Sequence, residues 1–437
     1  MNHMAYELHA ARRARLAEIL GPRTALVLFS PPERLRNGDV HHKFRQDSDI
    51  LYLTGFEEPG AVVVLRPGHE TASFVMFVRP RNPSEETWTG RRAGVQGARD
   101  VFGASAAYAA DELDTRLPDV VSGVEELHYH IGRDAEVDER MVRLLATLRG
   151  RERRGPHAPV KIIDARLSVH EMRLFKTPPE LAIQRRAADI TAEAHIAAMR
   201  AARPGVNEYE IEALIDYTFR RKGGFGPGYP SIVGGGVNAT ILHYVENKAL
   251  LREGDLLLVD AGCEVDGFTA DVTRTFPVGG RFSEPQRRVY EAVLEAQLEA
   301  IAATKAGATL EAIHAGVVES LTRKMVALGL LSGEVPQLIE SGAYKAYYMH
   351  RTSHWLGMDV HDVGFYSLEG AARALEPGMV LTIEPGLYIA PDDEKAPIEY
   401  RGIGVRIEDD LVVTPDGNEI LTAGTPKSVA EMETLTR

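Results

Sequence analysis

Cysteine is almost absent from this sequence of 437 residues, and the single one, Cys263, leaves no internal disulfide to form. That usage fits a reducing compartment. No apolar run approaches the about 18 residues of a membrane-spanning helix, and the first twenty residues lack the apolar segment of a signal peptide. Positive charge is also in deficit, because the formal net charge is −13. We therefore expect a cytoplasmic protein whose partners are neither nucleic acid nor a membrane.

The composition that is present is typical of a soluble globular protein, with 44% hydrophobic and 26% charged residues in a chain long enough for two or three domains. In the first third, short apolar runs such as TALVLFS, AVVVLRP and SFVMFVRP alternate with helical patterns such as DERMVRLLATLRG. This alternation predicts an α/β domain with a mixed sheet over residues 1–175. The pair Pro178-Pro179 favours a helix start just beyond that boundary.

The rest of the chain, residues 176–437, has long helical patterns separated by pairs of strands, which predicts an α+β domain. The expected helices and strand pairs follow from the period of the apolar residues. Helices are predicted at about 180–202, 207–222, 284–306 and 309–329, and strand pairs at about 231–278 and 379–414.

An internal repeat joins the two strand-pair regions. LREGDLLLVDAG in the first and LEPGMVLTIEPG in the second each place a carboxylate, Asp260 or Glu384, six residues after one glycine and two before the next. The return strands match too, since Asp271 and Glu408 each stand four residues after a glycine. Chance similarity between generic strands is the weaker interpretation of four aligned acids. We therefore predict a pseudo-twofold repeat with these acids in equivalent positions.

These acids lie where they can share cations. Asp266-Gly267 is a turn signal, which places Asp260 and Asp271 on neighbouring strands and almost opposite each other. Side chains in such positions are about 4.5–8 Å apart. A lone pair of acids on a hairpin is more often a solvated face. Two such pairs at the ends of apolar strands favour a metal cluster.

A nitrogen ligand is expected from HRTSHWLGMDVHD, which contains His350, His354 and His361. Each histidine alone is more often a core or pocket residue, and the HExxH zinc motif is absent. Three in one segment, with His243 in ATILHY, favour a functional site. Cys263 is interpreted as a small buried residue rather than a ligand.

The charge of such a cluster indicates how many ions it would hold. Four carboxylates and one neutral imidazole carry about four negative charges, which two divalent cations would neutralise. The oxygen-rich donor set favours a hard ion such as Mn²⁺. Two ions about 3.5–4 Å apart can activate water and polarise a carbonyl.

Several segments carry a resemblance to a known family. VDAGCEVDGFTADVTRTF, HRTSHWLGMDVHDVG, TIEPGLYI and GVRIEDD resemble the motifs of the pita-bread metallopeptidases, which include methionine aminopeptidase, prolidase, aminopeptidase P and the metal-free creatinase. KFRQDSDILYLTGFEEPGAVVVL resembles the N-terminal domain shared by aminopeptidase P and prolidase, while ETWTGRRAG and LTAGTPKSVAEME are closer to bacterial aminopeptidase P. The five ligands of the family pattern occur in order as Asp260, Asp271, His354, Glu384 and Glu408.

The resemblance implies a creatinase-like N-terminal domain, a pita-bread catalytic domain and two divalent ions, with Mn²⁺ expected. It implies that Asp271 and Glu408 bridge the ions, that Asp260 binds one and His354 the other, and that Glu384 is both a ligand and the proton acceptor. It also implies catalytic or substrate-binding roles for His243, His350, His361, Tyr388, Arg406 and Trp88. For Arg406, neutralising surplus carboxylate charge is the alternative. For Trp88, a place in a hydrophobic core is the alternative.

The implied activity is that of a metal-dependent aminopeptidase acting on peptides with proline at position 2. Prolidase, which cleaves Xaa-Pro dipeptides, shares the ligands and stays open as an alternative. A non-catalytic pita-bread binding protein is disfavoured because all five ligands are present. A homo-oligomer, either dimer or tetramer, is expected from the bacterial relatives, in which the region around Trp88 reaches a neighbouring subunit. Arg351 departs from the Gly-Leu of many relatives and bears on substrate preference.

Overall fold

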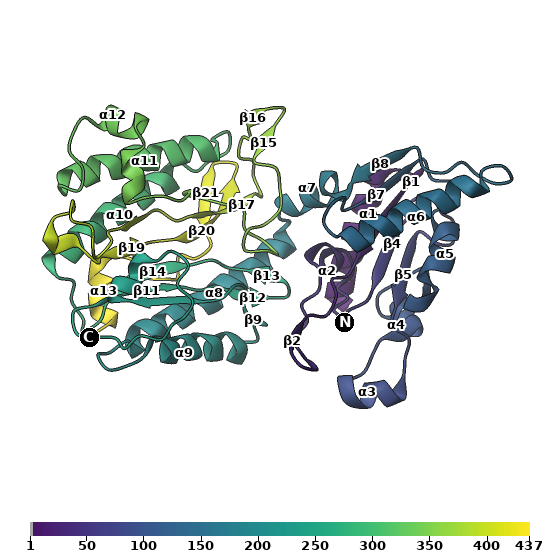
Figure 1. Ribbon diagram of the computed structural model, residues 1–437, viewed down its shortest axis with the longest axis horizontal. Coiled ribbons are helices and arrows are strands. Elements are labelled where there is room, and N and C mark those ends of the chain that lie inside the picture. The colour runs from purple at the N-terminus through teal and green to yellow at the C-terminus, as the bar shows by residue number, and fades with distance from the viewer. Residues whose placement is uncertain (1–2) are drawn as a thin grey trace. The chain divides into compact units, whose positions relative to one another are not determined.

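The structure, a computed structural model, describes residues 3–437 (Figure 1). The chain divides into two compact units: Met1–Met172, called here the N-terminal unit, and Arg173–Arg437, the C-terminal unit. Helix α7 (Val169–Leu174) spans the division between them. Across the described residues, no helix is both long and apolar enough to cross a membrane.

The N-terminal unit is built on one six-stranded sheet with the order β6-β5-β4-β1-β7-β8. Strand β1 is antiparallel to β4 and parallel to β7, so the predicted mixed sheet is confirmed. Runs such as VVVL in β4 suit this sheet because β-branched side chains pack well on a buried, pleated surface. The strands are β1 (Thr24–Phe29), β4 (Val62–Leu65), β5 (Phe74–Val78), β6 (Ala106–Ala109), β7 (Glu126–Tyr129) and β8 (Lys161–Asp164), with a separate hairpin of β2 (Leu35–Asn37) and β3 (Val40–His41).

Helix α6 of the N-terminal unit presents an apolar face to this sheet. In α6, Met141, Leu144 and Leu148 recur at helical spacing and pack in one core with Val27 and Phe77 of the strands. Helix α6 begins at Asp134, whose carboxylate accepts hydrogen bonds from backbone amides of the first turn. The helices are α1 (His3–Leu20), α2 (Ser48–Thr54), α3 (Pro83–Thr89), α4 (Gly94–Asp100), α5 (Leu113–Val120) and α6 (Ala135–Arg151).

The C-terminal unit contains two similar sets of strands, each made of an apolar strand, a hairpin and a return strand. In the first set β11 pairs with β14 around the hairpin β12–β13, and in the second β17 pairs with β20 around β18–β19. The predicted internal repeat is therefore confirmed. The strands are β9 (Gly226–Pro227), β10 (Ile232–Gly235), β11 (Leu256–Asp260), β12 (Cys263–Val265), β13 (Phe268–Thr269), β14 (Thr273–Pro277), β15 (Ser367–Leu368), β16 (Ala371–Ala372), β17 (Val380–Ile383), β18 (Gly386–Tyr388), β19 (Gly404–Arg406), β20 (Asp409–Thr414) and β21 (Gly417–Ile420).

Helix pairs cover these strands. Figure 1 shows β11, β14, β19 and β20 lying between the pair α8/α9 and the pair α10/α11. Helix α8 starts at the predicted proline pair, because Glu180 closes a capping box on Thr177. The helices are α8 (Pro178–Ala201), α9 (Glu208–Arg221), α10 (Glu284–Ala303), α11 (Leu310–Ala327), α12 (Val335–Glu340) and α13 (Val429–Leu435).

The turn of the first hairpin forms where the sequence indicated, but the strand register differs. Asp266 and Gly267 have φ of 48° and 83°, as a tight two-residue turn requires. The register, however, pairs Asp260 with Thr273, so Asp271 stands two residues ahead of the position opposite Asp260. The prediction that these two acids lie almost opposite each other is off by that diagonal step, which still leaves them within reach of one ion.

Candidate metal centre

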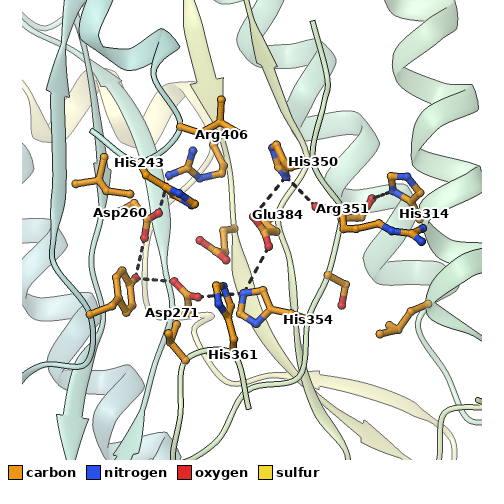
Figure 2. Close-up of a pocket in the computed structure, with 18 of the residues that line it drawn as sticks. His243, Asp260, Asp271, His314, His350, Arg351, His354, His361, Glu384 and Arg406 are labelled. Carbon is orange, nitrogen blue, oxygen red and sulfur yellow. Dashed lines mark hydrogen bonds and ion pairs between the residues drawn. The ribbon is translucent and has the colours of Figure 1, made fainter. Parts of the chain in front are cut away.

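Acidic side chains converge where the repeated strands of the C-terminal unit begin and end (Figure 2). Asp260 is the last residue of β11, and Glu384 directly follows β17, so each acid ends a buried apolar strand. Asp271 and Glu408 stand just ahead of the return strands β14 and β20. His354 joins them from the irregular segment that precedes β15. The five residues that were predicted as ligands are thus brought to one place.

The donor atoms of this cluster lie at distances suited to shared ions. Tyr229 Oη lies 2.7 Å from Asp260 Oδ1 and 2.5 Å from Asp271 Oδ1, so its hydroxyl can donate to either of the two carboxylates. His354 Nε2 lies 3.3 Å from Asp271 Oδ2 and 3.5 Å from Glu384 Oε1. One donor atom from each of Asp271, His354 and Glu408 can be chosen so that all lie within 4.8 Å of one another.

The ring of His354 is oriented as a ligand through Nε2. Its Nδ1 lies 3.0 Å from the backbone oxygen of Trp355, which can only accept, so Nδ1 carries a proton and Nε2 faces the carboxylates. Burial lowers the pKa of His354, but the hydrogen bond to Asp271 and the charge of Glu384 outweigh it and raise the pKa to about 9. The site therefore favours a positive charge at Nε2, which a metal ion would supply.

The buried carboxylates need more positive charge than the protein itself provides. Burial is the largest cause that raises the pKa of Asp260, and it raises that of Glu408 well above the usual range. Burial also raises the pKa of Glu384 to about 7, even though the charge of His354 opposes this. Four carboxylates with one guanidinium and one imidazole cannot all remain ionised in such a place without further cations. The donor set thus fits divalent metal ions.

Arg406 connects the carboxylates to the strands beneath them. Its side chain is buried, with Nη2 2.6 Å from Asp260 Oδ2, while Nε donates to Thr273 Oγ1 at 3.0 Å and Nη1 donates to Tyr388 Oη at 3.1 Å. Thr273 Oγ1 donates in turn to Glu408 Oε2 at 2.6 Å. These contacts are those expected of a residue that neutralises surplus carboxylate charge, as one of the two sequence interpretations held.

A second buried ion pair fixes the backbone from which the acids project. Arg274, fully buried, donates from Nη2 to Asp409 Oδ1 at 2.7 Å. Its Nη1 donates to the backbone oxygens of Thr273 and Glu408 at 2.9 and 2.5 Å. Because both return strands begin beside this one guanidinium, the positions of Asp271 and Glu408 are set by packing rather than by the ions alone.

Histidines line the cavity that opens onto the acids. The cavity has a volume of about 710 Å³, and His243, His350 and His361 are on its wall together with Asp260, Asp271 and Glu384. Burial, followed by the charge of Arg406, lowers the pKa of His350 to about 4, so this imidazole is neutral at physiological pH. Its Nε2 lies 2.9 Å from Tyr388 Oη.

Two residues of the site, Tyr229 and His314, were not identified from the sequence. Tyr229, which touches both Asp260 and Asp271, stands in GFGPGYPS, where no local motif marks it. His314 on α11 lines the cavity as well, and burial and the charge of Arg351 lower its pKa to about 4. A single histidine in a long helix carries no signal by itself. Arg351 lies on the cavity wall, and its effect on substrate preference stays a prediction.

Trp88 lies outside this cluster of side chains. It belongs to α3 of the N-terminal unit and is 89% exposed, so the alternative that placed it in a hydrophobic core is wrong. Its contact with substrate stays a prediction.

The chain matches the models of two known protein families and is similar to proteins of known activity. Residues 182–415 match the model of the family described as metallopeptidase family M24, and residues 9–129 match the aminopeptidase P N-terminal domain. The chain is 44% identical over 436 residues to the Xaa-Pro aminopeptidase of Escherichia coli strain K12, covering 100% of this chain and 98% of that protein. It is 35% identical to human Xaa-Pro aminopeptidase 3, covering 98% of this chain and 85% of that protein.

Solved structures are similar over the whole chain. The aminopeptidase PepP of Pseudomonas aeruginosa superposes with a TM-score of 0.96 at 46% identity, covering 99% of this chain and 98% of that one. Zinc-substituted Escherichia coli aminopeptidase P, in complex with product, superposes with a TM-score of 0.94 at 45% identity and the same coverage.

Proposed function

Because this chain belongs to metallopeptidase family M24, as its motifs indicated, we propose that it is a metal-dependent aminopeptidase that releases the N-terminal residue of peptides with proline at position 2. The pita-bread fold expected for the C-terminal unit is that of the family. The observation that carries the proposal is the convergence of four carboxylates and His354 on one cavity. Two relatives that match this chain over nearly its whole length, from Escherichia coli and Haemophilus influenzae, are Xaa-Pro aminopeptidases.

The residues that would hold metal are Asp260, Asp271, His354, Glu384 and Glu408, and we propose two divalent ions, with Mn²⁺ the expected metal. Four of the five donors are carboxylates, which prefer hard cations. Two such ions supply an activated water at neutral pH and polarise the scissile carbonyl. Asp271 and Glu408 would offer donor atoms within 4.8 Å of each other and of one on His354, while the ion pair with Arg406 would hold Asp260 in place.

The remaining steps belong to the side chains of the cavity. Glu384 accepts the proton of the attacking water, since its carboxylate reaches both His354 and the cavity. His243, His350 and His361 face the same space as hydrogen-bond partners for the scissile carbonyl and the leaving proline nitrogen. Tyr388 and Arg406 orient His350 and Asp260 through the contacts described above.

Selectivity for proline follows from the bond that is cleaved. A prolyl peptide bond is a tertiary amide without an N–H, so recognition must come from the shape of the ring rather than from a backbone donor. Apolar side chains for that purpose line the cavity beside the acids, among them Ile232, Leu242 and Val360. The free amino terminus of the peptide would be held by the carboxylates, which restricts cleavage to the first residue.

The test compares three matched substrates on chelator-stripped protein with and without added Mn²⁺. We expect metal-dependent release of the first residue from Xaa-Pro-Xaa and little from Xaa-Ala-Xaa. Cleavage of the Xaa-Pro dipeptide alone would make the protein a prolidase. Absence of cleavage of all three substrates with metal restored would refute the proposal.

We also propose that the protein is a homo-oligomer, a dimer or tetramer. Apolar side chains are exposed on two parts of the N-terminal unit that protrude at its lower end in Figure 1: Trp88 on α3, and Leu35 and Val40 on the hairpin β2–β3. We take these side chains as the candidates for a surface that another chain covers, because a contiguous exposed apolar patch marks such a surface. Light scattering of the wild type and of Trp88→Ala tests this, with a smaller mass expected for the variant.

A further inference from the structure

A second group of metal-ligating side chains lies in the N-terminal unit. Asp49 in the first turn of α2, His130 directly after β7 and His170 in the first turn of α7 come together from separate parts of the chain. His130 and His170 stand 81 and 121 residues from Asp49. The proposed peptidase reaction uses none of them, and they lie in a different unit from its acids.

Both imidazoles point the same ring nitrogen at one carboxylate oxygen. His130 Nε2 lies 2.8 Å and His170 Nε2 lies 3.2 Å from Asp49 Oδ2. The two rings lie side by side, with centroids 5.4 Å apart. One donor atom from each residue can be chosen so that all three lie within 4.8 Å of one another.

These distances match those between the ligands of a tetrahedral ion. With metal–ligand bonds of about 2.0–2.2 Å, neighbouring ligand atoms are about 3.3 Å apart. The observed separations of 2.8 and 3.2 Å differ from this by only a few tenths of an ångström. Small changes in the side-chain torsions therefore admit an ion between the three atoms.

The surroundings of the cluster suit a bound cation. The side chain of Asp49 is 1% exposed, and those of His130 and His170 are 12% and 15% exposed, so the donors are shielded while one edge stays open to a water ligand. The other ring nitrogen of His130, Nδ1, faces Asp164 Oδ1 at 4.0 Å. A carboxylate behind a ligating histidine is the usual outer partner in metal sites.

We propose that Asp49, His130 and His170 bind a divalent zinc ion, with water as the fourth ligand. Two imidazoles and one carboxylate form a nitrogen-rich donor set that suits zinc, whereas the four carboxylates of the C-terminal unit suit a harder ion. The ion joins α2, the end of β7 and the start of α7, three segments far apart in sequence. Its function is to tie the N-terminal unit together, and it takes no part in peptide hydrolysis.

The test counts zinc ions. Stripped protein is equilibrated with Zn²⁺, freed of excess ion by gel filtration and analysed by mass spectrometry of the metal. The variant is His130→Gln/His170→Gln, and the matched control is His42→Gln/His157→Gln, which changes two exposed histidines of the same unit. We expect the variant to bind one zinc ion per chain fewer than the wild type, and the control to match the wild type. Release of the first residue from Xaa-Pro-Xaa with Mn²⁺ should be unchanged in both.

Equal zinc counts in the variant and the wild type would overturn the proposal and leave a hydrogen-bonded cluster only. If the double variant does not fold by circular dichroism, His170→Gln alone serves, because its amide can still donate to Asp49 while a ligand is lost. Competition with a chromogenic chelator should then show zinc affinity at this site reduced by more than about 100-fold, since even outer partners of a metal site contribute about 10–100-fold. An unchanged affinity would contradict the assignment.

Discussion

Replacing Arg406 by alanine should destabilise the metal-free protein far more than the metal-loaded one. The side chain of Arg406 is 5% exposed, and its guanidinium lies 2.6 Å from Asp260 Oδ2. Removing one partner of such a buried pair leaves an uncompensated carboxylate, which costs about 3–5 kcal/mol. In the loaded protein the ions supply positive charge beside Asp260, so we expect the loss to fall below about 2 kcal/mol.

Urea unfolding of Arg406→Ala and the wild type, each with chelator and with Mn²⁺, measures this difference. Arg351→Ala is the matched control, because its guanidinium lines the same cavity but is exposed. The control should change the free energy of unfolding by no more than about 0.5 kcal/mol. An equal loss for Arg406→Ala with and without metal would refute the view that Arg406 substitutes in part for the missing cations.

Three further predictions concern stability and assembly. Burial lowers the pKa of His195 from 6.5 to about 4. As the pH falls, this imidazole is therefore protonated in the unfolded chain before it is protonated in the folded one. The free energy of unfolding should fall by up to about 3 kcal/mol as the pH drops from about 6.5 to 4. Urea unfolding at pH 7 and pH 5 should show a smaller pH dependence for His195→Asn than for the wild type. A Cβ at Gly262 would lie 1.7 Å from the backbone oxygen of Ala270, so Gly262→Ala should cost about 3 kcal/mol in the same assay; a neutral effect would contradict this packing. Trp88→Ala should lower the oligomer mass while leaving the circular dichroism spectrum of the chain unchanged, and an unchanged mass would argue against α3 as an interface.

The convergence of the proposed metal ligands could be predicted from the sequence because the signal for them is local and repeated. Asp260 and Glu384 each end an apolar strand at the same offset from a glycine, and two strands with one pattern must place their last residues alike. The turn at Asp266-Gly267 was equally readable, since its two positive φ angles favour that residue pair. Both features are determined by residues that lie close together in the sequence.

Features that depend on distant segments were not predictable in this way. Tyr229 contacts Asp260 and Asp271 only because the turn before β10 folds over the end of β11, and no residue near Tyr229 encodes that approach. The exposure of Trp88 likewise depends on how α3 sits on its unit, which composition does not reveal. The register that pairs Asp260 with Thr273, by contrast, continues from the hairpin turn, where Val265 pairs with Phe268, and can be counted from that turn.

The central claim is that the five-residue cluster cleaves the bond before proline, and a stepwise Mn²⁺ titration of stripped protein tests it most directly. Release of the first residue from Xaa-Pro-Xaa is followed for the wild type and for His354→Ala at each metal concentration. We predict no release without metal, a rise to a plateau in the wild type, and a rate at least about 100-fold lower in His354→Ala. A full rate in the stripped protein, or equal plateaus for the two proteins, would contradict the account.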